Sequence, residues 1–323
     1  MHGIQRWRVA DGREVGKQTG MDMNAISVSR NGNWIVCGFV GGANVWDAEL
    51  QRKVVEVEDT NWVDAVDVSP ESTRFATGTG TDYRKANIWS VTTGERLVGP
   101  LEHDSAVRGI KFSPDGGHIA TACRASIHIF DSHSGDQLIT IYTEVHEWHA
   151  ITPIVWPSDG QRLFAISERG KIKSFHTSTG SQLAEWQSHS DNSGDVMSIA
   201  LSADNRVIAS FAGHSVSFWD TTTHTQLGSV LNDDGWIRSI AFSPDGTHLA
   251  TGEYNKTITI WNISEILPGS NLHITVSTTF PMMGRLICVY KPLSSLNQEC
   301  EWSLLSVADS ASNIPLVVFR HKM

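Results

Sequence analysis

The sequence predicts an all-β fold built from repeated small antiparallel sheets, and residues 237–262 show why. They contain three apolar runs, the last on a strict period of two, which is typical of β-strands. Two turn signals separate the runs, and the first is the stretch 243–246, Ser-Pro-Asp-Gly. A single sheet of this kind cannot bury both of its faces. Most of the remaining chain consists of imperfect copies of the unit, which would supply the missing neighbours.

The copies repeat at a nearly constant interval. An aromatic residue ends the third strand of each copy, at Trp7, Trp46, Trp89, Phe130, Phe175, Trp219 and Trp261. The intervals between these positions are 39, 43, 41, 45, 44 and 42 residues. An apolar residue eight positions later opens a fourth strand in six copies. A period of about 40–45 residues with four strands per unit is typical of a propeller blade.

These repeats resemble the WD40 family, because the dipeptide itself occurs as Trp46-Asp47 and Trp219-Asp220. The resemblance covers about residues 4 to 265, over six consecutive registers. It implies an all-β WD40-type β-propeller, for which we predict seven blades of four-stranded antiparallel sheets. The family's internal bonding network also uses a Gly-His pair and an Asp between the second and third strands. That Asp position holds other residues here, namely Tyr83, Arg124, Arg169, Gly213 and Asn255.

In chain order, the sequence begins inside a blade. Residues 4–7 match a third strand and residues 14–17 a fourth. Six further units are expected to start near Met23, Val63, Val107, Ile151, Val196 and Ile237. We therefore assign residues 1–265 to a WD40-repeat propeller with a partial first blade.

The register fails after Trp261, and residues 266–323 form a divergent C-terminal segment. Four β-like runs remain there, at residues 272–276, 286–290, 302–307 and 314–319. In one interpretation, the first run completes the sixth unit and the next two supply the strands missing from the N-terminal blade. In the other, the segment is an unrelated extension, or the chain is cut from a longer array. The sequence leaves both open.

The amino-acid composition argues against several classes of function. The formal net charge of −10 argues against general nucleic-acid binding, since phosphate contacts need clustered Lys and Arg. The four cysteines show no metal-binding spacing. The N-terminus lacks the apolar segment of a signal peptide, and no run of about 18 apolar residues occurs. We expect a cytoplasmic protein that does not bind membranes, with a nuclear location also compatible.

No motif in the sequence carries a reaction. His146 and His149 lie three residues apart, whereas the zincin motif needs four on a helix. No G-x-S-x-G, P-loop or helix-opening G-x-G-x-x-G is present. We therefore predict that the chain is not an enzyme and needs no cofactor, metal or small-molecule substrate.

The candidate site lies on the loop face. Loops before the first strand, and between the second and third strands, gather at one end of a propeller. In WD40 proteins these positions contact partners, so the resemblance implies that role here. Basic residues in these loops of three consecutive blades suggest a basic arc, and an exposed tryptophan is favoured at interfaces. The predicted partner-binding residues are Trp62, Asp64, Arg84, Lys85, Arg108, Arg124, Arg169, Trp236 and Arg238.

The sequence thus predicts a non-catalytic protein-interaction scaffold or adaptor that binds an unidentified protein partner. The arginines favour an acidic or phosphorylated segment, because a guanidinium pairs with carboxylate or phosphate through two hydrogen bonds. Two alternatives remain. The chain could be the sensor propeller of a larger signalling protein, or a propeller-based enzyme with convergent residues in its channel.

Overall fold

The computed structural model describes fourteen segments of the chain: residues 3–8, 14–19, 23–48, 52–80, 83–143, 154–167, 170–189, 196–243, 245–254, 257–263, 275–281, 285–287, 301–308 and 318–322. Every regular element within these segments is a β-strand. No helix in them is long and apolar enough to span a membrane. The all-β prediction is therefore confirmed.

The strands fall into two compact units. The central unit is Asn24–Ile199, and the terminal unit joins Met1–Met23 to Ala200–Met323. This division differs from the predicted one, because both chain ends lie in one unit. The split at residue 265 stays a prediction.

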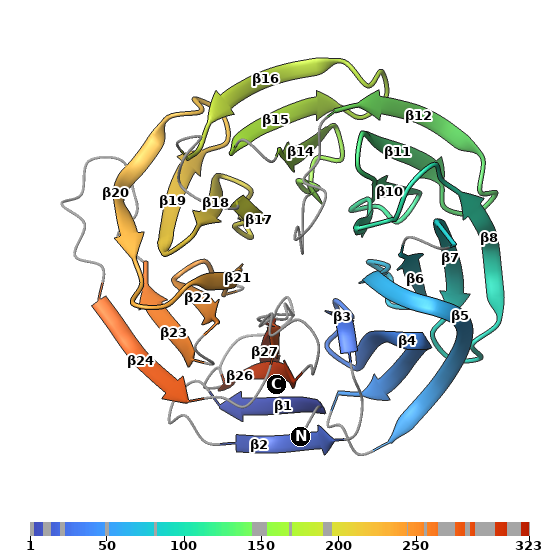
Figure 1. Ribbon diagram of the computed structural model, residues 1–323, viewed down its shortest axis with the longest axis horizontal. Coiled ribbons are helices and arrows are strands. Elements are labelled where there is room, and N and C mark those ends of the chain that lie inside the picture. The colour runs from blue at the N-terminus through green and yellow to red at the C-terminus, as the bar shows by residue number, and fades with distance from the viewer. Residues whose placement is uncertain are drawn as a thin grey trace. The chain divides into compact units, whose positions relative to one another are not determined.

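The central unit contains a continuous six-stranded sheet and two four-stranded sheets, all antiparallel. The six-stranded sheet consists of β3 (Met23–Val28), β4 (Trp34–Asp47), β5 (Lys53–Val68), β6 (Arg74–Thr79), β7 (Lys85–Ser90) and β8 (Arg96–Glu102). The second sheet consists of β9 (Gly109–Phe112), β10 (His118–Ala122), β11 (Ser126–Asp131) and β12 (Gln137–Tyr142). The third consists of β13 (Ile154–Val155), β14 (Arg162–Ile166), β15 (Lys171–His176) and β16 (Gln182–Gln187). Figure 1 shows β8, β12 and β16 as the outermost strands of their sheets.

Three more sheets follow, two of them wholly in the terminal unit and the first with part of its first strand in the central unit. One consists of β17 (Val196–Leu201), β18 (Val207–Ala212), β19 (Ser215–Asp220) and β20 (Gln226–Asn232). The next consists of β21 (Ile237–Phe242), β22 (His248–Glu253), β23 (Thr257–Asn262) and β24 (Thr275–Pro281). The last joins β1 (Gly3–Arg8) and β2 (Glu14–Thr19) to β25 (Arg285–Ile287), β26 (Glu301–Ala308) and β27 (Val318–Lys322).

The C-terminal strands complete sheets begun elsewhere in the chain. β24 pairs antiparallel with β23, with Thr259 opposite Thr279. β26 pairs antiparallel with β1, with Ile4 opposite Val307, and β25 pairs with β26. The resulting order β2-β1-β26-β25 gives the N-terminal hairpin the two strands that it lacks in sequence. Such pairing covers the hairpin edge that would otherwise be open.

The four-stranded sheets form propeller-type blades, because their cores lie between consecutive sheets. One cluster combines Ile88 and Leu101 of the β5–β8 strands with Phe112 and Phe130 of the β9–β12 sheet. The next combines Ile127 of β11 with Leu163 and Phe175 of the β13–β16 sheet, among others. The repeated aromatic is buried at Trp89, Phe130, Phe175, Trp219 and Trp261, and only partly buried at Trp46.

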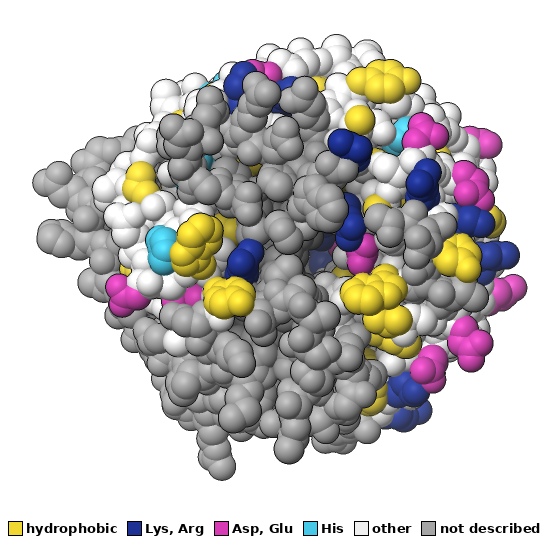
Figure 2. All heavy atoms as spheres, in the orientation of Figure 1, with side chains coloured by type: hydrophobic (Ala, Val, Ile, Leu, Met, Phe, Trp, Pro, Cys, Tyr) yellow, Lys and Arg dark blue, Asp and Glu magenta, His cyan; other side chains and the backbone are white. Residues whose placement is uncertain are grey.

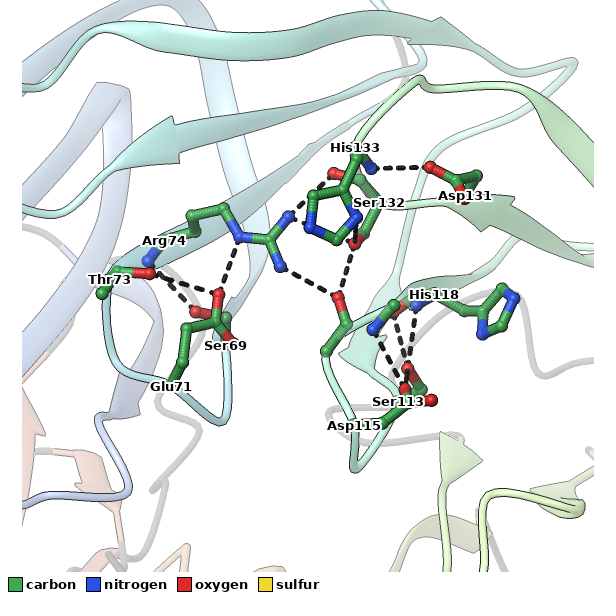
Figure 3. A network of polar contacts seen from close by, with 12 residues as sticks. Ser69, Glu71, Thr73, Arg74, Ser113, Asp115, His118, Asp131, Ser132 and His133 are labelled. Carbon is green, nitrogen blue, oxygen red and sulfur yellow. Dashed lines mark hydrogen bonds and ion pairs between the residues drawn. The ribbon is translucent and has the colours of Figure 1, made fainter.

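A polar clamp also joins neighbouring sheets of the central unit (Figure 3). Arg74, the first residue of β6, donates from Nη2 to the Gly116 carbonyl at 2.9 Å and from Nη1 to the Ser132 carbonyl at 3.0 Å. Its Nε donates to Glu71 Oε1 at 2.7 Å. The guanidinium also lies 5.5 Å from the centre of the Phe112 ring. One arginine thus satisfies carbonyls of two turns in the adjacent sheet.

The second-strand hydroxyls are used even though the family's Asp is missing. Thr77 accepts a hydrogen bond from Trp89 Nε1 at 2.9 Å, and Thr251 accepts one from Trp261 Nε1 at 3.0 Å. Thr121 lies 2.8 Å from His103 Nε2. Indole and imidazole groups therefore satisfy these buried hydroxyls, which would be costly to leave unpaired.

Two strands are longer than expected. β4 and β5 run through positions where the sequence suggested turns, so Trp62 lies within a strand and not in a loop. The pairing register between β4 and β5 shifts between Val40 and Gly42, and the strands bend at this irregularity. A bulge of this kind bends a strand without ending it.

Candidate partner-binding surface

Trp62 lies where β5 passes from one blade to the next. It stands opposite Val40 of β4, and its side chain is 47% exposed while that of Val40 is 49% exposed. Its carbonyl accepts a hydrogen bond from Gly80 N at 3.0 Å. Two apolar side chains are therefore presented together at the end of the β6 strand.

Gly80 allows this close approach. A Cβ placed on Gly80 would lie 2.8 Å from Asp64 Oδ2 and 3.8 Å from the Trp62 carbonyl oxygen. A side chain at this position would collide with the Asp64 carboxylate. Glycine at position 80 thus allows the β6–β7 loop to lie against Trp62 and Asp64 of β5.

Arg84 belongs to the same loop. Its N–H donates to the Gly80 carbonyl at 3.1 Å, and its backbone has a φ of 47°. Its Nη1 donates to the Asp104 carbonyl at 2.9 Å, which fixes the exposed side chain over the β8–β9 connection. A guanidinium has five N–H donors, so this bond uses a minor share of its capacity.

Lys85 is the first residue of β7, and both its backbone and its side chain make polar contacts. Its backbone N–H donates to Thr79 Oγ1 at 3.0 Å, and its Nζ lies 3.2 Å from Glu102 Oε1. The charge of Lys85 is therefore shared with a carboxylate of the outer strand β8.

Arg108, just before β9, is paired as well. Its Nη1 lies 2.5 Å from Asp64 Oδ2, and its backbone N–H donates to the Ala122 carbonyl at 2.9 Å. Asp64 was predicted as a partner contact, and in the structure it holds Arg108 in place. The pair is only partly exposed.

Arg124 is exposed in the β10–β11 loop of the next sheet. Its backbone N–H donates to Ser105 Oγ at 3.2 Å. Arg84 and Arg124 are thus anchored on the consecutive residues Asp104 and Ser105. The structure brings the loops of two adjacent sheets together at this point.

A half-buried histidine, His103, contacts the backbone of Arg84. His103 N donates to the Arg84 carbonyl at 2.9 Å, and its ring bonds to the Leu101 carbonyl and to Thr121. Burial, followed by the nearby His128, lowers the pKa of His103 to about 4. The ring is therefore neutral at physiological pH and adds no charge beneath Arg84.

The remaining predicted residues are placed differently. Arg169 lies outside the described residues. Trp236 and Arg238 belong to the terminal unit, where they form a separate cluster. There the Trp236 carbonyl accepts from Tyr254 N at 2.8 Å, the Trp236 ring meets His214 edge-on at 5.4 Å, and Arg238 lies 5.2 Å over the Tyr254 ring.

The central-unit residues define what we call the loop-face patch: Val40, Trp62, Tyr83, Arg84, Arg108 and Arg124. Sequence reasoning missed Val40 and Tyr83, both exposed. Tyr83 occupies a loop position that was noted only for lacking the family's Asp. Val40 lies within the long strand β4, and only the ladder with β5 shows that it faces Trp62.

The described part of the predicted basic arc also carries acidic side chains. Figure 2 shows Lys and Arg side chains interspersed with Asp and Glu over the side where β5 to β12 lie. The ion pairs of Arg108 with Asp64 and of Lys85 with Glu102 explain part of this mixing. Neighbouring carboxylates therefore neutralise part of the positive charge of Lys85 and Arg108.

Comparison with known proteins finds a family model that matches three stretches of the chain. A family model described as WD domain, G-beta repeat (WD40) matches residues 95–131, 180–220 and 224–262. Each match begins just before the outermost strand of one sheet and ends with the third strand of the next sheet.

Two groups of curated proteins are similar to this chain. The guanine nucleotide-binding protein subunit beta of Oryza sativa subsp. japonica is 28% identical over 215 residues, or 61% of this chain and 55% of that protein. Protein HIR1 of Cryptococcus neoformans var. neoformans serotype D is 25% identical over 285 residues, or 83% of this chain and 27% of that protein. The chain thus spans about half the length of the beta subunit and about a quarter of the length of the HIR1 protein.

A solved structure titled Kuenenia stuttgartiensis Hydrazine Synthase superposes with a TM-score of 0.70. The superposition covers 97% of this chain and 98% of that one, at 16% sequence identity. At this identity the similarity concerns the fold alone.

Proposed function

We propose that this chain, three stretches of which match the WD40 repeat model, is a non-catalytic protein-interaction scaffold. The similar plant proteins are by their name subunits of a larger protein, which supports a role in binding other proteins. We further propose that the loop-face patch binds an acidic or phosphorylated segment of a partner, in the cytoplasm.

One observation carries the finer proposal. The backbone of the exposed Trp62 bonds to Gly80, whose carbonyl accepts from Arg84 N, and Arg84 and Arg124 are held by consecutive residues of one connection. An aromatic anchor next to arginines is the composition that interface hot spots favour. Planar guanidinium groups bind carboxylate or phosphate in pairs of parallel hydrogen bonds.

The Arg108–Asp64 pair would help to select the ligand. Because Asp64 already satisfies part of Arg108, a weakly charged partner gains little there. A doubly charged phosphate could compete for the guanidinium, since charge-assisted hydrogen bonds are the stronger ones. We therefore favour a phosphorylated segment over one that is merely acidic.

Similarity to the much longer HIR1 proteins supports a second candidate. A chain that matches 27% of such a protein could be the sensing part of a larger signalling protein. In that case the same patch would contact another domain of the larger protein.

The proposal is tested by quantitative capture from a cell extract, with and without phosphatase treatment. Wild-type protein is compared with Trp62→Ala and with Arg84→Glu/Arg124→Glu. The control is Arg52→Glu/Arg96→Glu, which makes the same charge change at exposed positions away from the patch. The expected partners are sensitive to phosphatase, are lost by both patch variants and are retained by the control.

Circular dichroism checks that every variant is folded. Charge reversal should act mainly on the association rate, while Trp62→Ala should act mainly on the dissociation rate. An unchanged set of captured proteins from folded patch variants would contradict binding at this surface.

A further inference from the structure

Trp236 occupies in the terminal unit the position that Trp62 occupies in the central unit. The residue after each tryptophan is the first to pair with the following strand, β22 or β6. The Trp236 carbonyl accepts a hydrogen bond from Tyr254 N at 2.8 Å, just as the Trp62 carbonyl accepts one from Gly80 N at 3.0 Å. The exposed fractions are also alike, 48% for Trp236 and 47% for Trp62. The repeat therefore presents an exposed tryptophan with the same backbone contact in each unit.

Other ring side chains accompany Trp236. Its ring lies edge-on to that of His214, with 5.4 Å between the ring centres. Tyr254 is 46% exposed, and the guanidinium carbon of Arg238 lies 5.2 Å from the centre of the Tyr254 ring. Figure 2 shows a histidine beside hydrophobic and basic side chains on the side where β18, β21 and β22 lie in Figure 1. We call this surface the terminal-unit patch and define it as His214, Asp234, Trp236, Arg238 and Tyr254.

The charge around Trp236 is opposite in sign to that of the loop-face patch. Asp233 and Asp234 precede Trp236 in the β20–β21 connection, and Asp234 is exposed. Glu253 ends β22 and is buried. Among the described residues of these loops and of the strand ends beside them, three carboxyl groups stand with one guanidinium, that of Arg238. Burial raises the pKa of Asp233 to about 7, so above this pH its carboxylate adds to the negative charge of Asp234.

Exposed rings beside carboxylates form a surface that attracts cations. The face of a tryptophan or tyrosine ring attracts an ammonium or guanidinium group, and tryptophan attracts it most strongly. Arginine is favoured over lysine, because its planar guanidinium stacks on the ring and still donates hydrogen bonds to a carboxylate. Within the patch, Arg238 already lies over Tyr254, so a ring of this surface accepts a guanidinium. An acidic or phosphorylated ligand would instead be repelled by Asp234.

We propose that the terminal-unit patch binds a basic, arginine-containing segment of a protein partner. A guanidinium of that segment stacks on Trp236 and forms an ion pair with Asp234. The exposed ring supplies the aromatic anchor that interface hot spots favour, and the carboxylate selects the sign of the ligand's charge. A second copy of this chain is a poor ligand for the patch, because each copy has a formal net charge of −10.

This inference goes beyond the binding proposed for the loop-face patch. The two surfaces share the tryptophan position of the repeat but differ in charge, so they select segments of opposite charge. Each surface belongs to a different unit and contains its own tryptophan. A failure of binding at Trp236 would therefore leave the proposal for Trp62 standing, and the reverse also holds.

The test measures binding of a fluorescent peptide of arginine, glycine and serine to the purified chain by anisotropy. Matched peptides with lysine or glutamate in place of arginine are compared with it, at pH 8 and about 0.15 M salt. The patch variants are Trp236→Ala and Asp234→Asn. Trp62→Ala is the control for the tryptophan, since it truncates the equivalent residue of the other unit. Glu95→Gln is the control for the charge, since it removes one exposed carboxylate of the central unit.

The wild type should bind the arginine peptide more tightly than the lysine peptide, and should not bind the glutamate peptide. Trp236→Ala should raise the dissociation constant of the arginine peptide at least about tenfold, as truncation of a hot-spot residue does. Asp234→Asn should raise it about two- to fivefold, as expected for a solvent-exposed ion pair. Trp62→Ala and Glu95→Gln should leave it unchanged.

Circular dichroism checks the folding of each variant, and if Trp236→Ala fails to fold, Asp234→Asn decides alone. A wild type that does not bind the arginine peptide overturns the proposal. Equal affinities for the wild type and a folded Trp236→Ala variant also overturn it, because attraction would then be spread over the acidic chain. Binding of the glutamate peptide that is lost in Trp236→Ala would assign an acidic ligand to the patch and would overturn the proposal as well.

Discussion

Asp64 and Arg108 occupy equivalent positions of two consecutive blades, 44 residues apart, and their side chains form an ion pair of 2.5 Å. The same spacing separates Asp67 from Lys111, whose Nζ lies 2.8 Å from Asp67 Oδ1. Opposite charges at repeat-equivalent positions thus connect the inner strands of adjacent sheets. Each pair fixes the register of one blade against the next.

Alanine substitutions test how much the Asp64–Arg108 ion pair contributes to the free energy of unfolding. We expect Asp64→Ala and Arg108→Ala to show a coupling free energy below about 1 kcal/mol, because the pair is partly exposed to water. High salt should reduce the coupling further. The measurement is a double-mutant cycle by urea denaturation, at low and high salt. Coupling that is independent of salt would contradict an ion pair screened by solvent.

The repeated tryptophans differ in their polar contacts. Trp261 Nε1 donates to Thr251 Oγ1 at 3.0 Å, whereas Trp219 Nε1 is buried without a partner among the described residues. Trp261→Phe should therefore cost about 1 kcal/mol more than Trp219→Phe, since only the former leaves a buried hydroxyl with one partner fewer. Both variants lose the same atoms, so each is the control for the other. Equal losses in thermal unfolding would argue against a stabilising indole bond.

Gly78 in β6 allows its blade to pack closely against the connection to the next sheet. A Cβ on Gly78 would lie 2.6 Å from Val107 Cγ1, in the connection to the next sheet. Gly78→Ala should destabilise the fold by about 1–3 kcal/mol through overpacking. Val107→Ala in the same chain should remove the contact at 2.6 Å while its Cβ stays at 3.1 Å, so the double variant should lose less than the sum of the single losses.

The control for this prediction is Gly117→Ala, where the nearest atom to an added Cβ lies at 3.5 Å. Its effect on the urea midpoint should be small. A Gly78→Ala variant as stable as the control would mean that the two blades are less tightly packed at this position.

The local parts of the fold could be predicted from the sequence. The apolar periods and turn residues set the strands, and the recurring aromatic set the register, because these signals act within about 45 residues. The pairing of β26 with β1 joins residues about 300 apart, with no turn signal between them. The sequence therefore offered that pairing only as one of two interpretations.

The candidate site was less predictable for a related reason. Exposure of Trp62 follows from its place in the repeat, but its environment depends on contacts across sheets. Asp64 and Arg108 were both proposed as partner contacts, although their 44-residue spacing could have indicated an ion pair. Val40 carries no local signal of its own, since its position beside Trp62 arises from the β4–β5 ladder.

A pair of carboxylic acids lies inside the terminal unit. Asp233 Oδ2 accepts a hydrogen bond from Thr251 Oγ1 at 2.6 Å, and Glu253 Oε1 accepts one from Thr259 Oγ1 at 2.9 Å. Glu253 is only 2% exposed. Burial raises the pKa of Asp233 from 3.8 to about 7, and the neighbouring Glu253 carboxylate contributes to this rise. Bonds from Thr251 and from the N–H of Asp234 oppose it.

This arrangement predicts how stability changes with pH. Because the folded pKa of Asp233 lies above its unfolded value, the native state binds more protons between about pH 4 and 7. The contribution of the protonated acid is present at low pH and is lost as the pH rises through about 7. Asp233→Asn should remove this dependence, so its melting temperature should exceed that of the wild type at pH 8, and the difference should shrink toward zero as the pH falls to about 4. Asp234→Asn, at the exposed neighbour, is the control and should follow the wild type. Melting curves of the three proteins across this range are the measurement, and parallel profiles for Asp233→Asn and wild type would exclude Asp233 as the titrating group.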